Sequence, residues 1–296
     1  MDAAKKTEIP PIRAARRRFL AVLAEGTADD YCADLPRIEP EQILNENDVT
    51  VSYGSYGPHF DGMLHHQDGT FHVYCNNDRC GSRQEGRARF TLAHELGHYL
   101  IPEHHAALRR GLAPSHPSFC NRPDAKFYVE KEADFFASRL LMPEVRFAEV
   151  TRAAGHGLAA MRRVAQQFGT SLQSTARRFE DSLTHPCAFV MWREAKEPWF
   201  IISAALRRYG FLFVKTRSER VKGSATELAL GAPPPSTGEI YESTSLMARW
   251  FFGVEEGSIL DLPVREEAMR TAYGTFTWLS VEPAALAKLS PRSDWV

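Results

Sequence analysis

The sequence has no run of about 18 apolar residues, so nothing in it predicts a membrane-spanning helix. Its cysteines are few and odd in number, five along 296 residues, which does not suggest a disulfide framework. The opening stretch, MDAAKKTEIPPIRAARRRFL, is charged and contains proline, so it lacks the apolar centre of a signal peptide. We therefore expect a cytoplasmic protein whose cysteines are free thiols.

An excess of charge of one sign is also missing. Lys and Arg number 36 and Asp and Glu number 37, which leaves a net charge of −1. A chain this close to neutrality has no overall field that attracts nucleic acid or a membrane, so any nucleic-acid role must depend on a local patch. The hydrophobic fraction of 44% is ordinary for a globular protein, and the length allows two compact domains.

Hydrophobic patterning predicts an α+β protein in three parts. Residues 1–145 are expected to form a mainly helical domain with a small sheet, and 146–184 a helical segment. Residues 185–296 are expected to form a separate α+β domain. In the first part, helices are predicted at 11–25, 40–46, 87–101 and 124–142, a strand at 49–57, a hairpin or small sheet with Asp-Gly turns at 60–76, and a loop at 102–123.

The middle part contains VAQQFGTSLQSTARRFED, which has the pattern of a helix-turn-helix. Two ordinary packing helices explain this stretch at least as well as DNA binding does. In the third part, strands are predicted at CAFVMW, WFIISAAL, GFLFVK and GTFTWLSV, helices at SLMARWFFG and PVREEAMRTAY, and a loop at 232–238.

The stretch RARFTLAHELGHYLIP carries the strongest chemical signal. His94 and His98 are four residues apart, so on a helix both imidazoles can reach one metal ion, while Glu95 can address a metal-bound water. The neighbouring residues are almost all apolar, which predicts a buried helix, and a metal would satisfy its buried polar groups. The alternative is two core histidines held by backbone hydrogen bonds and a paired glutamate. Gly97 costs about 1 kcal/mol in a helix, so a close approach is expected there.

Catalytic zinc sites usually have three protein ligands and one open position. The helix DAKFYVEKEADFFASRLLMP offers Glu130, Glu132 and Asp134. Glu130 and Asp134 share a helix face, so we expect Glu130 to bind the metal and Asp134 to accept a hydrogen bond from a ligand imidazole. Glu132 is rotated by about 200° from Glu130 and points elsewhere; a solvated helix face is an equally good reading for it.

Together, RFTLAHELGHYL, VEKEADFFASRLLMP and the upstream DG…HVYCN run closely resemble the ImmA/IrrE family of bacterial metallopeptidases. The resemblance covers roughly residues 10–182, including the helix-turn-helix-like stretch. The family commonly has Asn at the position of Asp134, so this sequence departs from the family there. Family members with an added C-terminal domain have one that resembles a GAF sensor, which implies a GAF-like domain at 185–296.

The resemblance implies a zinc endopeptidase that cleaves a partner repressor of the Xre helix-turn-helix type. Cleavage would derepress a stress, DNA-damage, mobile-element or anti-phage operon. One Zn²⁺ held by His94, His98 and Glu130 would lower the pKa of its water, and Glu95 would take the proton. Candidates for stabilising the oxyanion are Tyr99, Tyr128, His104, His105 and His116.

Two other readings stay open. The first is a non-catalytic regulator that keeps the metal for structure and acts by binding DNA or a partner protein. The second is a toxin–antitoxin partner that acts by stoichiometric binding. An intact Glu95 argues against the first, because a purely structural metal site needs no general base.

Two features suggest how a protease could be kept inactive. Cys120 lies in the predicted loop between the two motif helices, where its thiolate could fill the open metal position, although a loop cysteine without a role is the simpler reading. The stretch 206–222 interleaves basic and aromatic residues, which suits single-stranded DNA as an activator. The alternation of its aromatics at 209, 211 and 213 favours the other reading, a hairpin with buried rings. The basic residues are Arg207, Arg208, Lys215, Arg217, Arg220 and Lys222.

Overall fold

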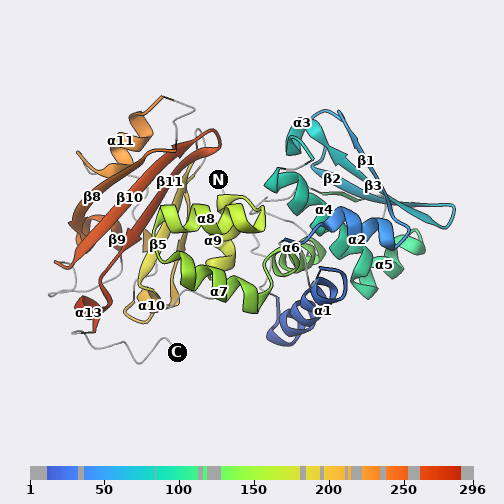
Figure 1. The fold of residues 1–296 in the computed structure, drawn as a ribbon, viewed down its shortest axis with the longest axis horizontal. Helices are drawn as coiled ribbons and strands as arrows, with labels where there is room; N and C mark the ends of the chain where they lie inside the picture. The colour runs from blue at the N-terminus through green and yellow to red at the C-terminus, as the bar shows by residue number, and fades with distance from the viewer. Residues whose placement is uncertain are drawn as a thin grey trace, which may run out of the picture. The chain divides into compact units, whose positions relative to one another are not determined.

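The computed structural model describes residues 12–32, 37–83, 85–112, 116–118, 128–180, 185–193, 197–210, 213–214, 222–233, 238–252 and 261–287 (Figure 1). The chain forms two compact units. The first runs to Glu149 and includes Ala165–Ser171; the second comprises Val150–Val164 and the chain from Leu172 onward. The division into three parts expected from the sequence, with boundaries after residues 145 and 184, stays a prediction.

The first unit combines helices with a four-stranded sheet of order β1-β3-β2-β4. β1 is parallel to β3, and β2 is antiparallel to both β3 and β4. The strands are β1 (Thr50–Gly54), β2 (Gly62–Gln67), β3 (Thr70–Asn76) and β4 (His116–Ser118). The helices are α1 (Ala14–Cys32), α2 (Pro40–Glu46), α3 (Asn77–Cys80), α4 (Gly86–Leu100), α5 (Pro102–Arg109), α6 (Tyr128–Leu141) and α7 (Glu144–Ala154), the last of which continues into the second unit.

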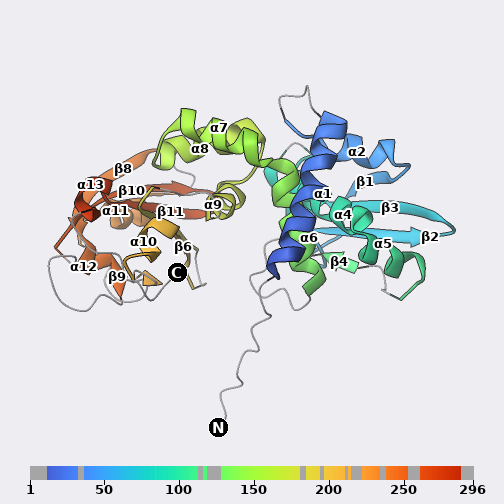
Figure 2. The ribbon, with the colours of Figure 1, turned by 90° about the horizontal axis from the view of Figure 1, so that it is seen from below.

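Helix α4 is the centre of this unit. It packs against α6 on one side and against β2 and β3 on another, and α1 lies alongside α6 (Figure 2). Every residue of α4 from Ala88 to His98 is buried, as the apolar sequence around the histidines predicts. The α4–α6 contact therefore brings the two motif helices together.

The predicted hairpin is confirmed over β2 and β3. Gln67 pairs with Thr70, so the connection is the two-residue loop Asp68-Gly69. Both loop residues have positive φ, 51° and 83°, which is the conformation that Asp-Gly favours in tight hairpins. The other Asp-Gly pair is not a turn of this kind: Asp61 precedes β2 and Gly62 begins it.

The predicted loop at 102–123 is wrong in two places. Pro102, which was expected only to end α4, stands in the first turn of α5, where a proline loses no hydrogen bond. Residues His116–Ser118 form β4, which pairs with β2 at Gly62–Leu64. The predicted start of α6 at 124 lies outside the described residues.

The second unit is built on an antiparallel five-stranded sheet of order β6-β5-β11-β10-β8. Its strands are β5 (Cys187–Trp192), β6 (Trp199–Ile202), β8 (Ile240–Leu246), β10 (Pro263–Thr271) and β11 (Gly274–Ser280), and a separate pair joins β7 (Phe213–Val214) to β9 (Phe251–Phe252). The helices are α8 (Leu158–Phe168), α9 (Leu172–Glu180), α10 (Ala204–Arg207), α11 (Ala225–Gly231), α12 (Met247–Trp250) and α13 (Pro283–Leu286). The end of α8 and the turn after it cluster with the first unit.

The α+β class is confirmed, but the helix predicted at PVREEAMRTAY is wrong. This stretch is β10, an inner strand of the sheet. Within this strand Glu266 is buried and accepts hydrogen bonds from the Thr226 amide (2.6 Å) and the Ser243 hydroxyl (3.0 Å). Tertiary hydrogen bonds therefore override the local pattern.

Smaller errors occur elsewhere in this unit. In SLMARWFFG only Met247–Trp250 is helical, because the flanks belong to β8 and β9. The strand predicted through WFIISAAL ends at Ile202, and α10 begins two residues later with Ser203 as its N-cap. Across the described ranges, none of the helices has the length and apolar character needed to cross a bilayer.

Candidate metal site

Three side chains from α4 and α6 meet in the first unit: His94, His98 and Glu130. The two Nε2 atoms are 3.1 Å apart, and the Glu130 carboxylate lies 3.4 Å from His94 Nε2 and 3.2 Å from His98 Nε2. The three ligand atoms lie within 4.8 Å of one another, so the group could hold a metal ion. All three residues are buried.

The separation of α4 from α6 depends on Gly97. A Cβ atom built at Gly97 would lie 3.0 Å from the Phe136 ring and 3.4 Å from Ala133 Cα. Glycine therefore lets the two helices approach until a glutamate on one reaches the histidines on the other. This is the close approach that a glycine within the motif predicted.

Asp134 contacts the outer nitrogen of His94. Its Oδ1 lies 2.9 Å from His94 Nδ1, so the imidazole donates from Nδ1 and presents Nε2 to Glu130. Burial lowers the pKa of His94, but hydrogen bonds to Asp134 and Glu130 outweigh it and raise the pKa well above the ordinary value. The pocket therefore stabilises positive charge at His94.

The outer nitrogen of His98 faces a second histidine. His98 Nδ1 is 3.2 Å from His104 Nδ1, and His104 Nε2 is 3.2 Å from Glu132 Oε2. Burial lowers the pKa of His98 to about 4 and also lowers that of His104. Glu132 is only 4% exposed, so the solvated-face reading of this residue is wrong.

The donor set fits a metal cation. With Nδ1–H of His94 directed at Asp134 and His98 neutral, the Nε2 atoms of both imidazoles converge with the Glu130 carboxylate, and in the metal-free protein a proton on His94 Nε2 supplies positive charge among them. Three acceptors that converge in a buried pocket repel one another unless a positive charge lies between them. A metal ion supplies that charge, and two imidazoles with a carboxylate are ligands typical of zinc.

Glu95 packs against Gly62, the first residue of β2. Glu95 is fully buried at 0% exposure. A Cβ atom at Gly62 would lie 2.8 Å from Glu95 Oε1 and 2.4 Å from Thr91 Cγ2. Only glycine allows the strand to pass so close to α4. Gly62 is a residue that the sequence reading missed, because its Asp-Gly pair was interpreted as a turn.

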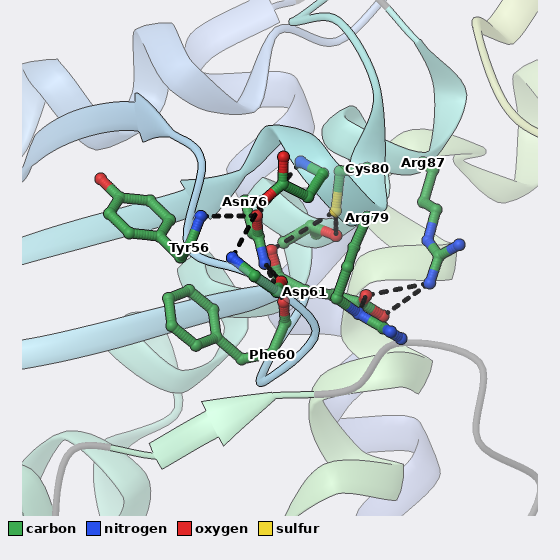
Figure 3. Close-up of polar contacts among 10 residues, drawn as sticks. Tyr56, Phe60, Asp61, Asn76, Arg79, Cys80 and Arg87 are labelled. Atoms are coloured by element: carbon green, nitrogen blue, oxygen red, sulfur yellow. Dashed lines mark hydrogen bonds and ion pairs between the residues drawn. The ribbon is translucent and has the colours of Figure 1, made fainter.

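The approach of β2 to α4 is held by a polar cluster around Asp61 (Figure 3). The buried Asp61 carboxylate accepts hydrogen bonds from Arg79 Nε (2.5 Å) and Arg87 Nη2 (2.9 and 3.0 Å), and Arg87 belongs to the first turn of α4. The Asp61 carbonyl accepts from the Asn76 amide (3.0 Å) and from Cys80 Sγ (3.4 Å). These contacts connect the start of β2 to α3, β3 and α4.

The residues considered for oxyanion stabilisation have other contacts where they are described. The side chain of His116 lies outside the described set, and His104 contacts His98. The remaining contacts are Tyr99 hydroxyl to Asn47 carbonyl (3.2 Å), Arg13 amide to Tyr128 hydroxyl (3.3 Å), and His105 Nδ1 to Tyr99 carbonyl (2.8 Å). The geometry therefore assigns the oxyanion role to none of these four.

The regulatory candidates are only partly described. Cys120, Lys215, Arg217 and Arg220 lie outside the described residues. Arg207, Arg208 and Lys222 are exposed, while Tyr209 packs against the core of the second unit, as the buried-ring reading expects. In the helix-turn-helix-like segment, the described side chains of α9 from Leu172 to Phe179 are all buried or half-buried.

A buried His-Glu-x-x-His helix receives a glutamate from a second helix next to a small sheet, and the three side chains His94, His98 and Glu130 could hold a metal ion. Residues 81–180 match the family model of the IrrE N-terminal-like domain, M78 peptidase, which confirms the resemblance to the ImmA/IrrE family. The match spans α4, α6 and the helix-turn-helix-like segment.

One solved structure shares the fold across both units. A Mycobacterium tuberculosis transcriptional regulator matches with a TM-score of 0.53 and 15% identity, covering 95% of each chain. At that identity the likeness concerns the fold alone. None of the curated proteins compared with this sequence matches it.

Proposed function

We propose that this protein is a zinc-dependent endopeptidase that cleaves an Xre-type helix-turn-helix repressor. Cleavage would derepress a stress, DNA-damage or anti-phage operon. The observation that carries the proposal is the convergence of His94, His98 and Glu130 within 4.8 Å, with Glu95 beside His94 on the same buried helix. Two imidazoles and one carboxylate with an open position suit catalytic zinc, although copper and nickel would compete in vitro.

Zinc, when bound, would polarise the scissile carbonyl and make the attacking water more acidic. Glu95 takes a proton from that water and passes it to the leaving amine. Its burial keeps bulk water from competing for the same carboxylate. Asp134 holds His94 in the tautomer that directs Nε2 inward.

The rival proposal is a regulator that binds DNA through α9 without catalysis. A recognition helix needs an exposed face to enter the major groove. The burial of the described α9 side chains and the stacking of the Arg177 guanidinium on Trp199, 5.1 Å from the ring centre, disfavour that role. Activation by single-stranded DNA belongs to the leading proposal, and the exposed Arg207 and Arg208 support it.

The test is cleavage of the helix-turn-helix protein encoded beside this one. The wild type, Glu95→Gln and the exposed-site control Glu46→Gln are each loaded with zinc and incubated with that protein, with and without single-stranded DNA. We expect cleavage by wild type and control only. If none of the three cleaves while all hold one zinc and bind the partner equally, the peptidase proposal fails. Equal cleavage with and without DNA would remove DNA as the activator.

A further inference from the structure

A chain of hydrogen bonds leads from His98 to the protein surface through four elements. His98 on α4 contacts His104 on α5, and His104 contacts Glu132 on α6. Glu132 in turn accepts two hydrogen bonds from Arg16 on α1, at 2.8 Å from Nε and 2.6 Å from Nη2. Along a second edge of the guanidinium, Nη1 and Nη2 each donate a hydrogen bond of 3.0 Å to one carboxylate oxygen of the exposed Glu103.

The end of this chain determines which nitrogen of each imidazole carries a proton. Glu132 holds the Arg16 guanidinium as a carboxylate, so it can only accept from His104 Nε2. The imidazole of His104 donates its N–H from Nε2 to Glu132, so its Nδ1, 3.2 Å from His98 Nδ1, is the acceptor of that pair. His98 must donate to that acceptor from its own Nδ1, which leaves its Nε2 lone pair facing His94 and Glu130.

The two histidines of the motif are thus oriented differently. His94 is oriented directly by a carboxylate, Asp134, as metal-bound histidines often are. The Nδ1 atom of His98 contacts a second imidazole, His104, which in turn contacts Glu132. This series of hydrogen bonds extends to Glu132, which lies on the other side of α6 from Glu130, and so gives the buried Glu132 carboxylate its partners.

We propose that His104, Glu132 and Arg16 are positioning residues that hold His98 with Nε2 directed at the metal. The inference rests on the proposed zinc site, and it adds helices α1 and α5 to the elements that support that site. Neither His104 nor Glu132 is a ligand: their contacts lie on the outer side of the His98 ring. Their effect should appear in the affinity for zinc itself.

The experiment compares two replacements of His104. In His104→Gln the amide can still accept from His98 and donate to Glu132, whereas His104→Leu fills similar space without either bond. We expect His104→Leu to weaken zinc binding by about 10–100-fold and His104→Gln to restore it to within a few-fold of wild type. Affinity is measured by competition with a chromophoric chelator, and the unfolding of the metal-free protein is recorded in parallel.

Matched controls separate the chain from its surroundings. His105→Leu alters the next residue of α5, whose Nδ1 contacts the Tyr99 carbonyl instead. Glu103→Gln removes the exposed partner of Arg16 and leaves the bonds to Glu132. Both controls should bind zinc as the wild type does, while Arg16→Met, at a partly exposed position, should weaken binding by a few-fold.

The outcomes are distinguishable. If the wild type binds no zinc through His94 and His98, the metal site fails and the positioning role fails with it. If the wild type binds zinc and His104→Leu binds equally well, the positioning role alone is overturned. It is also overturned if His104→Gln and His104→Leu weaken binding equally, since packing rather than hydrogen bonding would then be responsible. Arg16→Met decides the matter if His104→Leu does not fold.

Discussion

Replacing Gly62 with alanine should impair catalysis while leaving metal binding intact. The added methyl carbon would lie 2.4 Å from Thr91 Cγ2 and 2.8 Å from Glu95 Oε1. Ordinary contacts between carbon atoms begin at about 3.5 Å. Roughly 1 Å of movement must therefore be shared between the strand, the threonine and the Glu95 carboxylate. Glu95 is the group that can swing away most easily, because it ends a flexible side chain.

The magnitudes follow from that displacement. Overpacking of a buried contact costs about 1–3 kcal/mol of unfolding free energy. Moving a catalytic group by about 1 Å costs on the order of 100-fold in rate. The three atoms nearest to the new methyl carbon belong to Thr91 and Glu95 and not to the metal ligands, so zinc affinity should stay within a few-fold of wild type.

Three measurements check this: cleavage rate, urea unfolding and zinc competition. Gly26→Ala is the control, because no atom lies within 4 Å of a Cβ at that position in α1. It should retain activity and gain about 0.5–1 kcal/mol of stability from helix propensity. If Gly62→Ala cleaves at the wild-type rate and unfolds at the wild-type urea concentration, the reasoning that β2 positions Glu95 is refuted.

Three further predictions concern the metal site. The raised pKa of His94 means that zinc must displace a proton from this residue near neutral pH, so the affinity for zinc should rise by about tenfold per pH unit up to that pKa. Calorimetry in buffers of different ionisation enthalpy should detect one proton released per zinc bound. A zinc affinity that stays constant between pH 6 and 8 would contradict this prediction. For the same reason, the metal-free fold has the full stabilisation from charged His94 below about pH 6.5 and loses it as pH rises through the raised pKa. Gly97→Val should push α4 from Phe136, lowering unfolding free energy by about 1–3 kcal/mol and weakening zinc binding together; unchanged zinc affinity would show that helix spacing does not determine the site.

Local patterns were sufficient for the centre of the first unit. The apolar surroundings of the histidines predict a buried helix, and Asp68-Gly69 predicts a tight hairpin; α4 and the β2–β3 loop have these forms. The spacing of Glu130 and Asp134 places both carboxylates on one face of α6, and the structure brings both to His94. In each case the signal lies within a few residues of the feature.

Long-range contacts account for what could not be predicted. Arg16 and Glu132 are 116 residues apart, and no periodicity in α1 or α6 marks them as partners. Glu132 has the spacing of a solvated residue, and only tertiary packing shows that it is buried. The same reason explains the error at β10, where Glu266 is buried by hydrogen bonds from Thr226 and Ser243.

The central claim is that His94, His98 and Glu130 bind one zinc ion and leave a position open. X-ray absorption at the zinc edge of the loaded full-length protein tests it most directly. The account predicts nitrogen and oxygen neighbours only, at about 2.0–2.2 Å, with imidazole scattering from two histidines. A sulfur neighbour at about 2.3 Å would contradict it, because a cysteine would then occupy the position that the reaction requires.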